Sequence, residues 1–411
     1  MLYTWTKVAL LSAALSGLCT PVLANTTATT GMSPQLAQAS VVETFPVSPP
    51  ASSSDFRLPG DASQNAPGGT AGAVARVALM LPLRSETLGK AAEAVRNGFM
   101  AAHAYEKTGI AVNVIETADA VPDMLSSYAT AAAQHDIIVG PLSRSGAAAI
   151  AQSGSVSKPT ITLTQPELAG DTTEGKPRNL LSVGLSIEEE ARQAADWAIG
   201  SADPGTAYIV STATAWQRRA AKAFAAEWQH QGRKSEIIEI PLTSGYLGAK
   251  GLAQLKQQMQ SEKPALIFAA LDANQALQLR LALGTQIPMY GTSQLNPYTQ
   301  PMAGNEAAAE MDGVRLLDIP WQLQPDHPAV MVYPRPVVAA DQKRSPDMER
   351  LYALGIDAYR ITREIALQRT DFEIDGVTGK LTVRFGQSAP YFERIGQHAI
   401  YRDGGVAPEQ R

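Results

Sequence analysis

Cysteine is almost absent from this sequence, because Cys19 is the single example in a chain of 411 residues. One thiol forms no intramolecular disulfide and leaves no cysteine cluster for a structural zinc site. The histidines offer no replacement, since each stands without a second histidine or cysteine three or four residues away; they are His103, His135, His230, His327 and His398. We therefore expect neither a metal centre nor another bound cofactor.

An excess of basic residues is also missing. Lysine and arginine together number 34 against 39 aspartates and glutamates, so the formal net charge is −5. This balance does not favour nucleic acid or an anionic membrane surface as a partner. No stretch beyond the first thirty residues approaches the ~20 apolar residues that a transmembrane helix requires, so we expect no integral membrane segment.

Catalytic motifs are present only as fragments. Residues 155–158 (Ser-Val-Ser-Lys) match the serine–lysine pattern of penicillin-binding enzymes, but the Lys-Thr-Gly match at 107–109 precedes that pattern instead of following it. Residues 170–177 resemble a phosphate-binding loop, yet Pro177 replaces the hydroxyl residue that would bind magnesium. Residues 188–190 are three glutamates that open a predicted helix, where negative charge complements the helix dipole. We expect a protein that is not an enzyme.

The first residues have the pattern of a secretory signal. Lys7 precedes a mainly apolar run, Val8–Leu18, and small residues lead to a predicted cleavage site after Ala24. Lipidation at Cys19 is the alternative, but Leu18 occupies the position where a lipoprotein signal carries a small residue. We therefore expect residues 1–24 to be a signal peptide and the mature protein to be periplasmic and not lipidated.

Residues 25–74 contain mostly Thr, Ala, Ser, Pro and Gly, with few large apolar side chains. Such a composition cannot bury enough surface to offset the entropy lost on ordering. We expect a disordered tether, semi-flexible around the Ser-Pro-Pro-Ala-Ser-Ser-Ser stretch at 48–54.

Beyond the tether, short apolar runs alternate with amphipathic helical patterns. The run Val77–Leu81 is typical of a buried parallel strand, and the segment from about Glu86 carries a helical apolar face of Leu88, Ala91, Val95, Phe99 and Ala102. The same rhythm restarts after residue 184, and a long helix is predicted at Met348–Leu367. We predict two doubly wound, Rossmann-like α/β lobes with a cleft between them. Lobe I is assigned residues 75–184 and 295–371, and lobe II residues 185–294 and 372–411.

Several blocks of this body resemble the type I periplasmic-binding fold and, within it, the C-terminal domain of LpoA-type penicillin-binding protein activators. The blocks that carry the resemblance are residues 79–83, 94–102, 138–144, 185–195, 223–228, 350–359 and 376–381. The resemblance implies docking onto a bifunctional class A penicillin-binding protein and stimulation of peptidoglycan synthesis.

A solute-binding protein for an amino acid or small polar ligand, serving an ABC transporter, is the alternative within this fold. The residues that we expect at its cleft are Arg84, Ser143, Arg144, Ser145, Thr164, Gln165 and Asp272. Hydroxyl groups at a helix N-terminus suit an anionic ligand. Ser143 and Ser145 are equally typical of helix caps, so both interpretations stay open at these positions.

Overall fold

The computed structural model describes residues 75–167, 177–201, 203–298, 306–337, 344–386 and 389–409. The predicted signal peptide with Cys19 and the predicted tether therefore lie outside the described residues. None of the helices in these ranges combines the length and the apolar character needed to cross a membrane.

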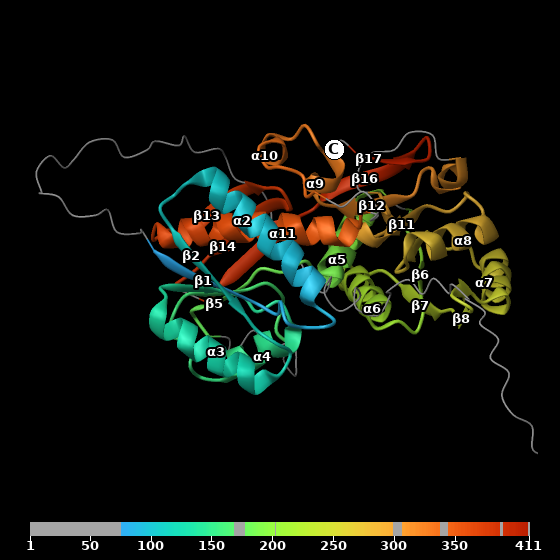
Figure 1. The fold of residues 1–411 in the computed structure, drawn as a ribbon. Coiled ribbons are helices and arrows are strands. Elements are labelled where there is room, and N and C mark those ends of the chain that lie inside the picture. The colour runs from blue at the N-terminus through green and yellow to red at the C-terminus, as the bar shows by residue number, and fades with distance from the viewer. Residues whose placement is uncertain are drawn as a thin grey trace, which may run out of the picture. The chain divides into compact units, whose positions relative to one another are not determined.

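The first sheet has five parallel strands in the order β2-β1-β3-β4-β5 (Figure 1). Its strands are β1 (Arg76–Leu81), β2 (Ala111–Glu116), β3 (Ile137–Val139), β4 (Thr160–Thr162) and β5 (Leu180–Ser182), and the connecting helices are α2 (Gly89–Glu106), α3 (Val121–Gln134) and α4 (Arg144–Gln152). Residues 77–81 are fully buried, as the apolar run predicts for a strand that is covered on both faces.

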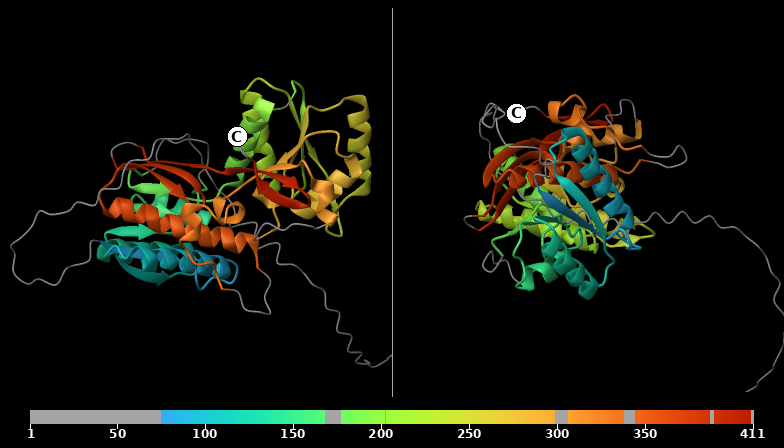
Figure 2. Two further views of the ribbon diagram at one scale, coloured as in Figure 1. Left: turned by 90° about the horizontal axis from the view of Figure 1, so that it is seen from above. Right: turned by 60° about the vertical axis from the view of Figure 1, so that its left-hand side comes forward.

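The long helix α11 (Pro346–Ala366) packs along α2, and the two helices lie side by side in Figures 1 and 2. Glycines make this close approach feasible. A methyl group at Gly98 would overlap the main-chain carbonyl of Tyr352, and one at Gly355 would overlap that of Val95. The apolar face predicted for α2 is buried here through Ala91, Val95, Phe99 and Ala102.

The second sheet has seven strands in the order β17-β16-β12-β11-β10-β6-β7. Its strands are β6 (Ala207–Ser211), β7 (Ser235–Glu239), β10 (Leu266–Ala269), β11 (Met289–Gly291), β12 (Arg315–Asp318), β16 (Gln397–Arg402) and β17 (Gly405–Pro408). The first five of these run parallel, and β16 and β17 add antiparallel pairings at one edge.

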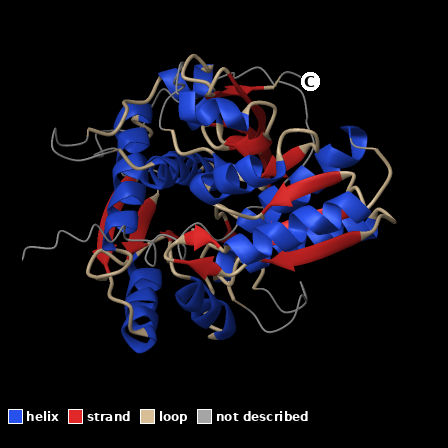
Figure 3. Ribbon diagram, turned by 90° about the vertical axis from the view of Figure 1, so that its right-hand side faces the viewer, coloured by secondary structure: helices blue, strands red, loops and turns tan. Residues whose placement is uncertain are grey.

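Helices cover both faces of this second sheet, as Figure 3 shows. They are α5 (Ile187–Ser201), α6 (Ala215–His230), α7 (Ala249–Ser261) and α8 (Ala273–Leu283), with a small hairpin of β8 (Leu242–Thr243) and β9 (Tyr246–Leu247) beside them. The alternation along β6 sends Tyr208 and Val210 into one core and Ala207 and Ile209 into the other. Parallel sheets that are covered by helices confirm the predicted α/β class.

A third sheet is antiparallel and contains β13 (Asp371–Gly376), β14 (Gly379–Arg384) and β15 (Tyr391–Ile395). Its apolar residues, among them Phe372 and Leu381, share one core with β1 and α11. Strands β13, β14 and β15 therefore pack with the first sheet, whereas the predicted division put residues 372–411 in lobe II. Conversely, β12 pairs with β11 in the second sheet, although residues 295–371 were assigned to lobe I.

The chain crosses between the two cores at three points of its described part. The first crossing joins β5 to α5. The second joins β12 to the short helices α9 (Pro320–Leu323) and α10 (Pro328–Met331), and the third joins β15 to β16. A 3-10 turn, η1 (Ser293–Leu295), follows β11 near the second crossing. These crossings position the polar clusters described next.

Candidate functional site

The residues predicted to face a ligand lie after parallel strands of the first and second sheets. Arg84 is exposed after β1, and its guanidinium donates to the main-chain oxygen of Glu116 at 3.2 Å, so it binds the end of β2. Thr164 is buried and Gln165 half-buried after β4. Ser145 is exposed in the first turn of α4.

Two of the predicted residues cap helices. Ser143 is the N-cap of α4, and its hydroxyl accepts a hydrogen bond from the main-chain N–H of Gly146 at 3.3 Å. Asp272 is the N-cap of α8 and forms a reciprocal capping box with Gln275. Burial raises the pKa of the Asp272 carboxyl. The capping interpretation is thus confirmed for Ser143, and both oxygen acceptors are engaged within the protein.

Arg144 takes part in an ion-pair triad that joins the two cores. Its guanidinium lies 3.4 Å from Glu188 in the first turn of α5, and the same carboxylate oxygen is 2.9 Å from Nε of Arg219 on α6. Ser186 donates a further hydrogen bond to Glu188 at 3.0 Å. Glu188 therefore does more than complement the helix dipole, because it binds a cation from each side of the first crossing.

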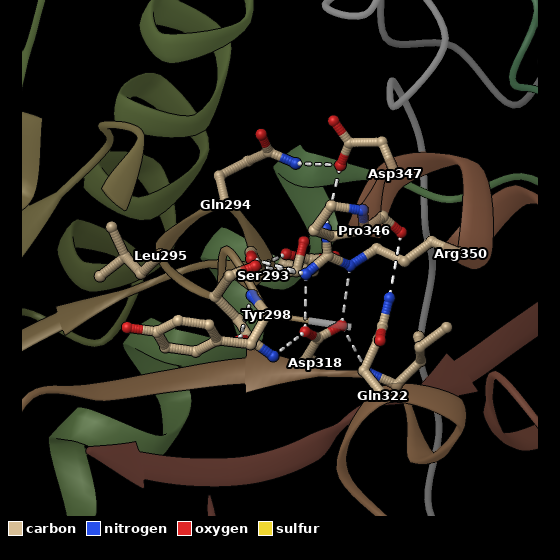
Figure 4. Close-up of polar contacts among 12 residues, drawn as sticks. Ser293, Gln294, Leu295, Tyr298, Asp318, Gln322, Pro346, Asp347 and Arg350 are labelled. Carbon is tan, nitrogen blue, oxygen red and sulfur yellow. Dashed lines mark hydrogen bonds and ion pairs between the residues drawn. The ribbon is translucent and has the colours of Figure 1, made fainter. Parts of the chain in front are cut away.

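A buried polar cluster lies at the second crossing, and Figure 4 shows its contacts. Arg350 of α11 makes two hydrogen bonds to Asp318 at the end of β12, at 2.9 and 2.7 Å, and both side chains are at most 2% exposed. The guanidinium also donates to Asp347 and to the main-chain oxygens of Ser293 and Asn296. Burial opposes the charge of Arg350, but the surrounding carboxylates raise its pKa above the ordinary value.

Glu190 of α5 completes this cluster from the opposite side. Its carboxyl accepts a hydrogen bond from the main-chain N–H of Ser293 at 2.7 Å. Burial, strengthened by the neighbouring Asp318 charge, raises the pKa of Glu190 to about 8. A pKa of about 8 leaves the Glu190 carboxyl mostly protonated at neutral pH.

The two blocks 350–359 and 376–381 meet in space. The buried carboxylate of Asp357 on α11 accepts hydrogen bonds from the main-chain N–H groups of Val377 and Thr378, at 3.1 and 2.8 Å, and from the Thr378 hydroxyl at 2.6 Å. Asp357 therefore anchors the β13–β14 turn to the helix. Sequence reasoning did not single out Asp357 or Arg350, although charged residues among the apolar positions of a helix were a signal for both.

Metal-site geometry is not found in the described ranges, where no three His, Cys, Asp or Glu side chains gather closely enough to hold an ion. The serine of the serine–lysine match, Ser155, is exposed after α4 and shares a hydrogen bond with the Ser153 hydroxyl at 2.7 Å. It thus occupies a surface turn.

Comparison with known protein families finds one that matches nearly all of this body. The model of the family described as LppC putative lipoprotein matches residues 23–241 and 239–404. Among curated proteins, penicillin-binding protein activator LpoA of Edwardsiella piscicida is 28% identical over 338 residues, which are 71% of this chain and 45% of that protein. LpoA of Vibrio cholerae is 26% identical over 355 residues, 74% of this chain and 54% of that protein. The chain thus spans about half the length of these relatives.

Two solved structures are similar over about four-fifths of this chain. The LpoA C-domain from Haemophilus influenzae, named as a regulator of PBP1A, has a TM-score of 0.63 and 21% identity, covering 82% of this chain and 100% of that one. A putative branched-chain amino acid ABC transporter from Chromobacterium violaceum has a TM-score of 0.61 and 33% identity, covering 79% of this chain and 99% of that one. These similarities confirm the two-lobed periplasmic-binding fold and the resemblance that the sequence blocks carry.

Proposed function

Because the chain belongs to the LppC putative lipoprotein family, we propose that it activates a class A penicillin-binding protein and so promotes peptidoglycan synthesis. It acts by docking and performs no catalysis of its own. Relatives named as penicillin-binding protein activators match most of the described body, which supports this role. The proposal includes export to the periplasm, with cleavage after Ala24 rather than lipidation at Cys19.

The observation that favours activation over solute carriage is the internal use of the predicted ligand groups. The oxygens of Ser143 and Asp272 cap helices, and the guanidinium of Arg144 pairs with Glu188. A solute carrier needs such groups directed at its ligand, because a buried polar group that loses its partner is costly. In this chain the same groups stabilise its own helices and its first crossing.

Solute binding remains the second candidate, because one specific observation favours it. The Chromobacterium violaceum protein, named as a branched-chain amino acid ABC transporter, is 33% identical over 99% of its length. Under this alternative, Arg84, Ser145, Thr164 and Gln165 contact an amino acid between the lobes. A thermal-shift screen against amino acids tests it, since a ligand at a hundredfold excess over Kd stabilises the protein by about 2.7 kcal/mol.

The decisive assay measures glycan-strand polymerisation and peptide crosslinking by a purified class A penicillin-binding protein from the same cell. Adding the full mature chain is expected to raise both rates in a saturable manner. An equal concentration of an amino-acid-binding protein of the same fold is the matched control and leaves the rates unchanged. Unchanged rates with this chain, combined with a firm amino-acid hit, overturn the activator proposal in favour of solute binding.

A further inference from the structure

A cavity of about 580 Å³ lies at the third crossing, where β15 continues into β16. We call it the crossover pocket. Its wall combines the first residues of β14, Gly379 and Lys380, with Gly396 of the crossing, Gln397 of β16, His327 at the N-cap of α10, and Pro408 of β17. The volume falls within the range of roughly 300–1,000 Å³ that small-molecule sites occupy. None of the residues predicted to bind a ligand lines it.

Among the charged residues that line the crossover pocket, Lys380 is a cation without an ion-pair partner in the described ranges. Glu409 is paired with Arg315 at 3.2 Å, and the Asp375 carboxylate lies 3.6 Å from Nε2 of His327, a contact that is an ion pair only when the ring is protonated. Lys380 stands opposite Asp375 in the β13–β14 register, yet its ammonium group makes no ion pair with any residue in the described ranges. The open positive charge therefore favours a carboxylate in the ligand.

The other polar groups of the crossover pocket are held in place by neighbouring residues. His398 stacks on Trp197, with ring centroids 4.1 Å apart and planes within 7°. The Nδ1 atom of His327 accepts a hydrogen bond from the N–H of Ala329 at 3.3 Å, which leaves Nε2 as the donor nitrogen of the ring. The Gln397 amide donates to the main-chain oxygen of His398 at 3.0 Å. Such planar, oriented polar side chains suit a ligand that is rich in hydroxyl and amide groups.

We propose that the crossover pocket binds a carboxylate-bearing peptidoglycan fragment, with Lys380 holding the carboxylate and the imidazole and amide groups around it binding hydroxyls or amides. The identity of the ligand rests on the proposed function, because a protein that works on peptidoglycan synthesis meets such fragments. Two sources share this chemistry, the lactyl carboxylate of a muramic acid saccharide and the carboxylates of a stem peptide. Because the lining comes from β14 and from β16, a bound fragment connects elements of both cores.

Isothermal titration of the full mature chain tests this proposal with three probes. They are the N-acetylglucosaminyl-N-acetylmuramic acid disaccharide, a free stem tetrapeptide, and neutral N,N′-diacetylchitobiose (called chitobiose below). At least one carboxylate probe is expected to bind about tenfold or more tightly than chitobiose, since a charge-assisted contact is worth at least this factor. Binding of the saccharide alone or of the peptide alone identifies the source, and each result supports the pocket.

Variants locate the binding site. Lys380→Ala is expected to weaken the carboxylate probe about tenfold, and Lys380→Arg to retain most of the affinity. Lys250→Ala is the matched control, because it removes an equally exposed charge on α7 that does not line the pocket. Lys380 is exposed, so both of its variants should fold, and their unliganded melting temperatures check this.

Two results overturn the proposal. The first is no binding of either carboxylate probe, and the second is binding that Lys380→Ala leaves unchanged, which places the ligand elsewhere. The synthase assay distinguishes failure of this proposal from failure of the proposed function. If the chain stimulates the synthase but binds no fragment, only the pocket proposal is wrong. If it binds fragments without stimulating the synthase, the activator role is wrong.

Discussion

The strand ends where the sequence predicts a ligand differ sharply from the crossover pocket, although both regions are rich in polar side chains. At the strand ends, Ser143 and Asp272 cap helices and Arg144 belongs to an ion-pair triad. At the crossover pocket, Lys380 borders about 580 Å³ of space and has no ion-pair partner among the described residues. Polar residues at the end of a strand therefore do not by themselves mark a binding site, because here the protein uses them for its own helix caps and ion pairs.

The buried cluster at the second crossing gives the largest expected effect on stability. Arg350→Met leaves the Asp318 carboxylate buried without its cation, which is expected to cost about 3–5 kcal/mol of unfolding free energy. Chemical denaturation monitored by circular dichroism measures it. Arg218→Met, at an exposed pair with Glu239, is the control and should leave the midpoint almost unchanged. An equally small effect at Arg350 would show that the cluster does not stabilise the crossing.

Asp357, which holds the β13–β14 turn against α11, is expected to have the second-largest effect on stability. Asp357→Ala removes the acceptor of two main-chain N–H groups and one hydroxyl, all buried, and is expected to cost about 2–4 kcal/mol. Because this turn leads into Lys380, the variant should also weaken fragment binding at the crossover pocket. Asp371→Ala, at an exposed position of the same sheet, is the control. Full stability with intact binding would contradict the anchoring role.

The raised pKa of Glu190 predicts that the stability of the protein depends on pH. This pKa is about 8 in the folded protein against an ordinary 4.5, so between these values the folded state holds a proton that the unfolded chain has released. Stability should therefore fall as pH rises from about 5 to about 8, with a slope of up to about 1.4 kcal/mol per pH unit from this group. Glu190→Gln keeps an acceptor for Ser293 and should remove this contribution. Identical pH profiles of the two proteins would contradict a buried, protonated Glu190.

The smallest effect separates the two serines of the predicted ligand site. Ser143→Ala loses the cap of α4 and should cost about 1 kcal/mol, whereas Ser145→Ala, at an exposed position, should change stability by less than about 0.5 kcal/mol. Equal effects would contradict the assignment of Ser143 as a cap. A loss of amino-acid binding in Ser145→Ala would instead favour the solute-binding alternative.

Local patterns predicted much of the fold. The run Val77–Leu81 is a buried strand, and the long C-terminal helix predicted at Met348–Leu367 is α11, residues 346–366. Periodicity shows that a face is buried but does not show against which core it packs. The lobe boundaries therefore differed for β12 and for β13–β15, whose partners lie far away in the sequence.

The polar clusters were harder to predict. Glu190, Asp318 and Arg350 are separated by more than a hundred residues from first to last, so no spacing in the sequence connects them. Glu188 and Glu190 look alike as residues of one helix start, yet one pairs with two arginines and the other is buried and protonated. Only the tertiary contacts distinguish these environments. The crossover pocket is equally hard to predict, because its lining residues come from four separate segments.

Direct capture of the synthase tests the central claim most directly. The full mature chain is immobilised, and the equilibrium binding of each purified class A penicillin-binding protein from the same cell is measured, with an amino-acid-binding protein of the same fold as reference. We predict saturable binding of at least one synthase to this chain and none to the reference. Absence of binding for every class A synthase would contradict the account.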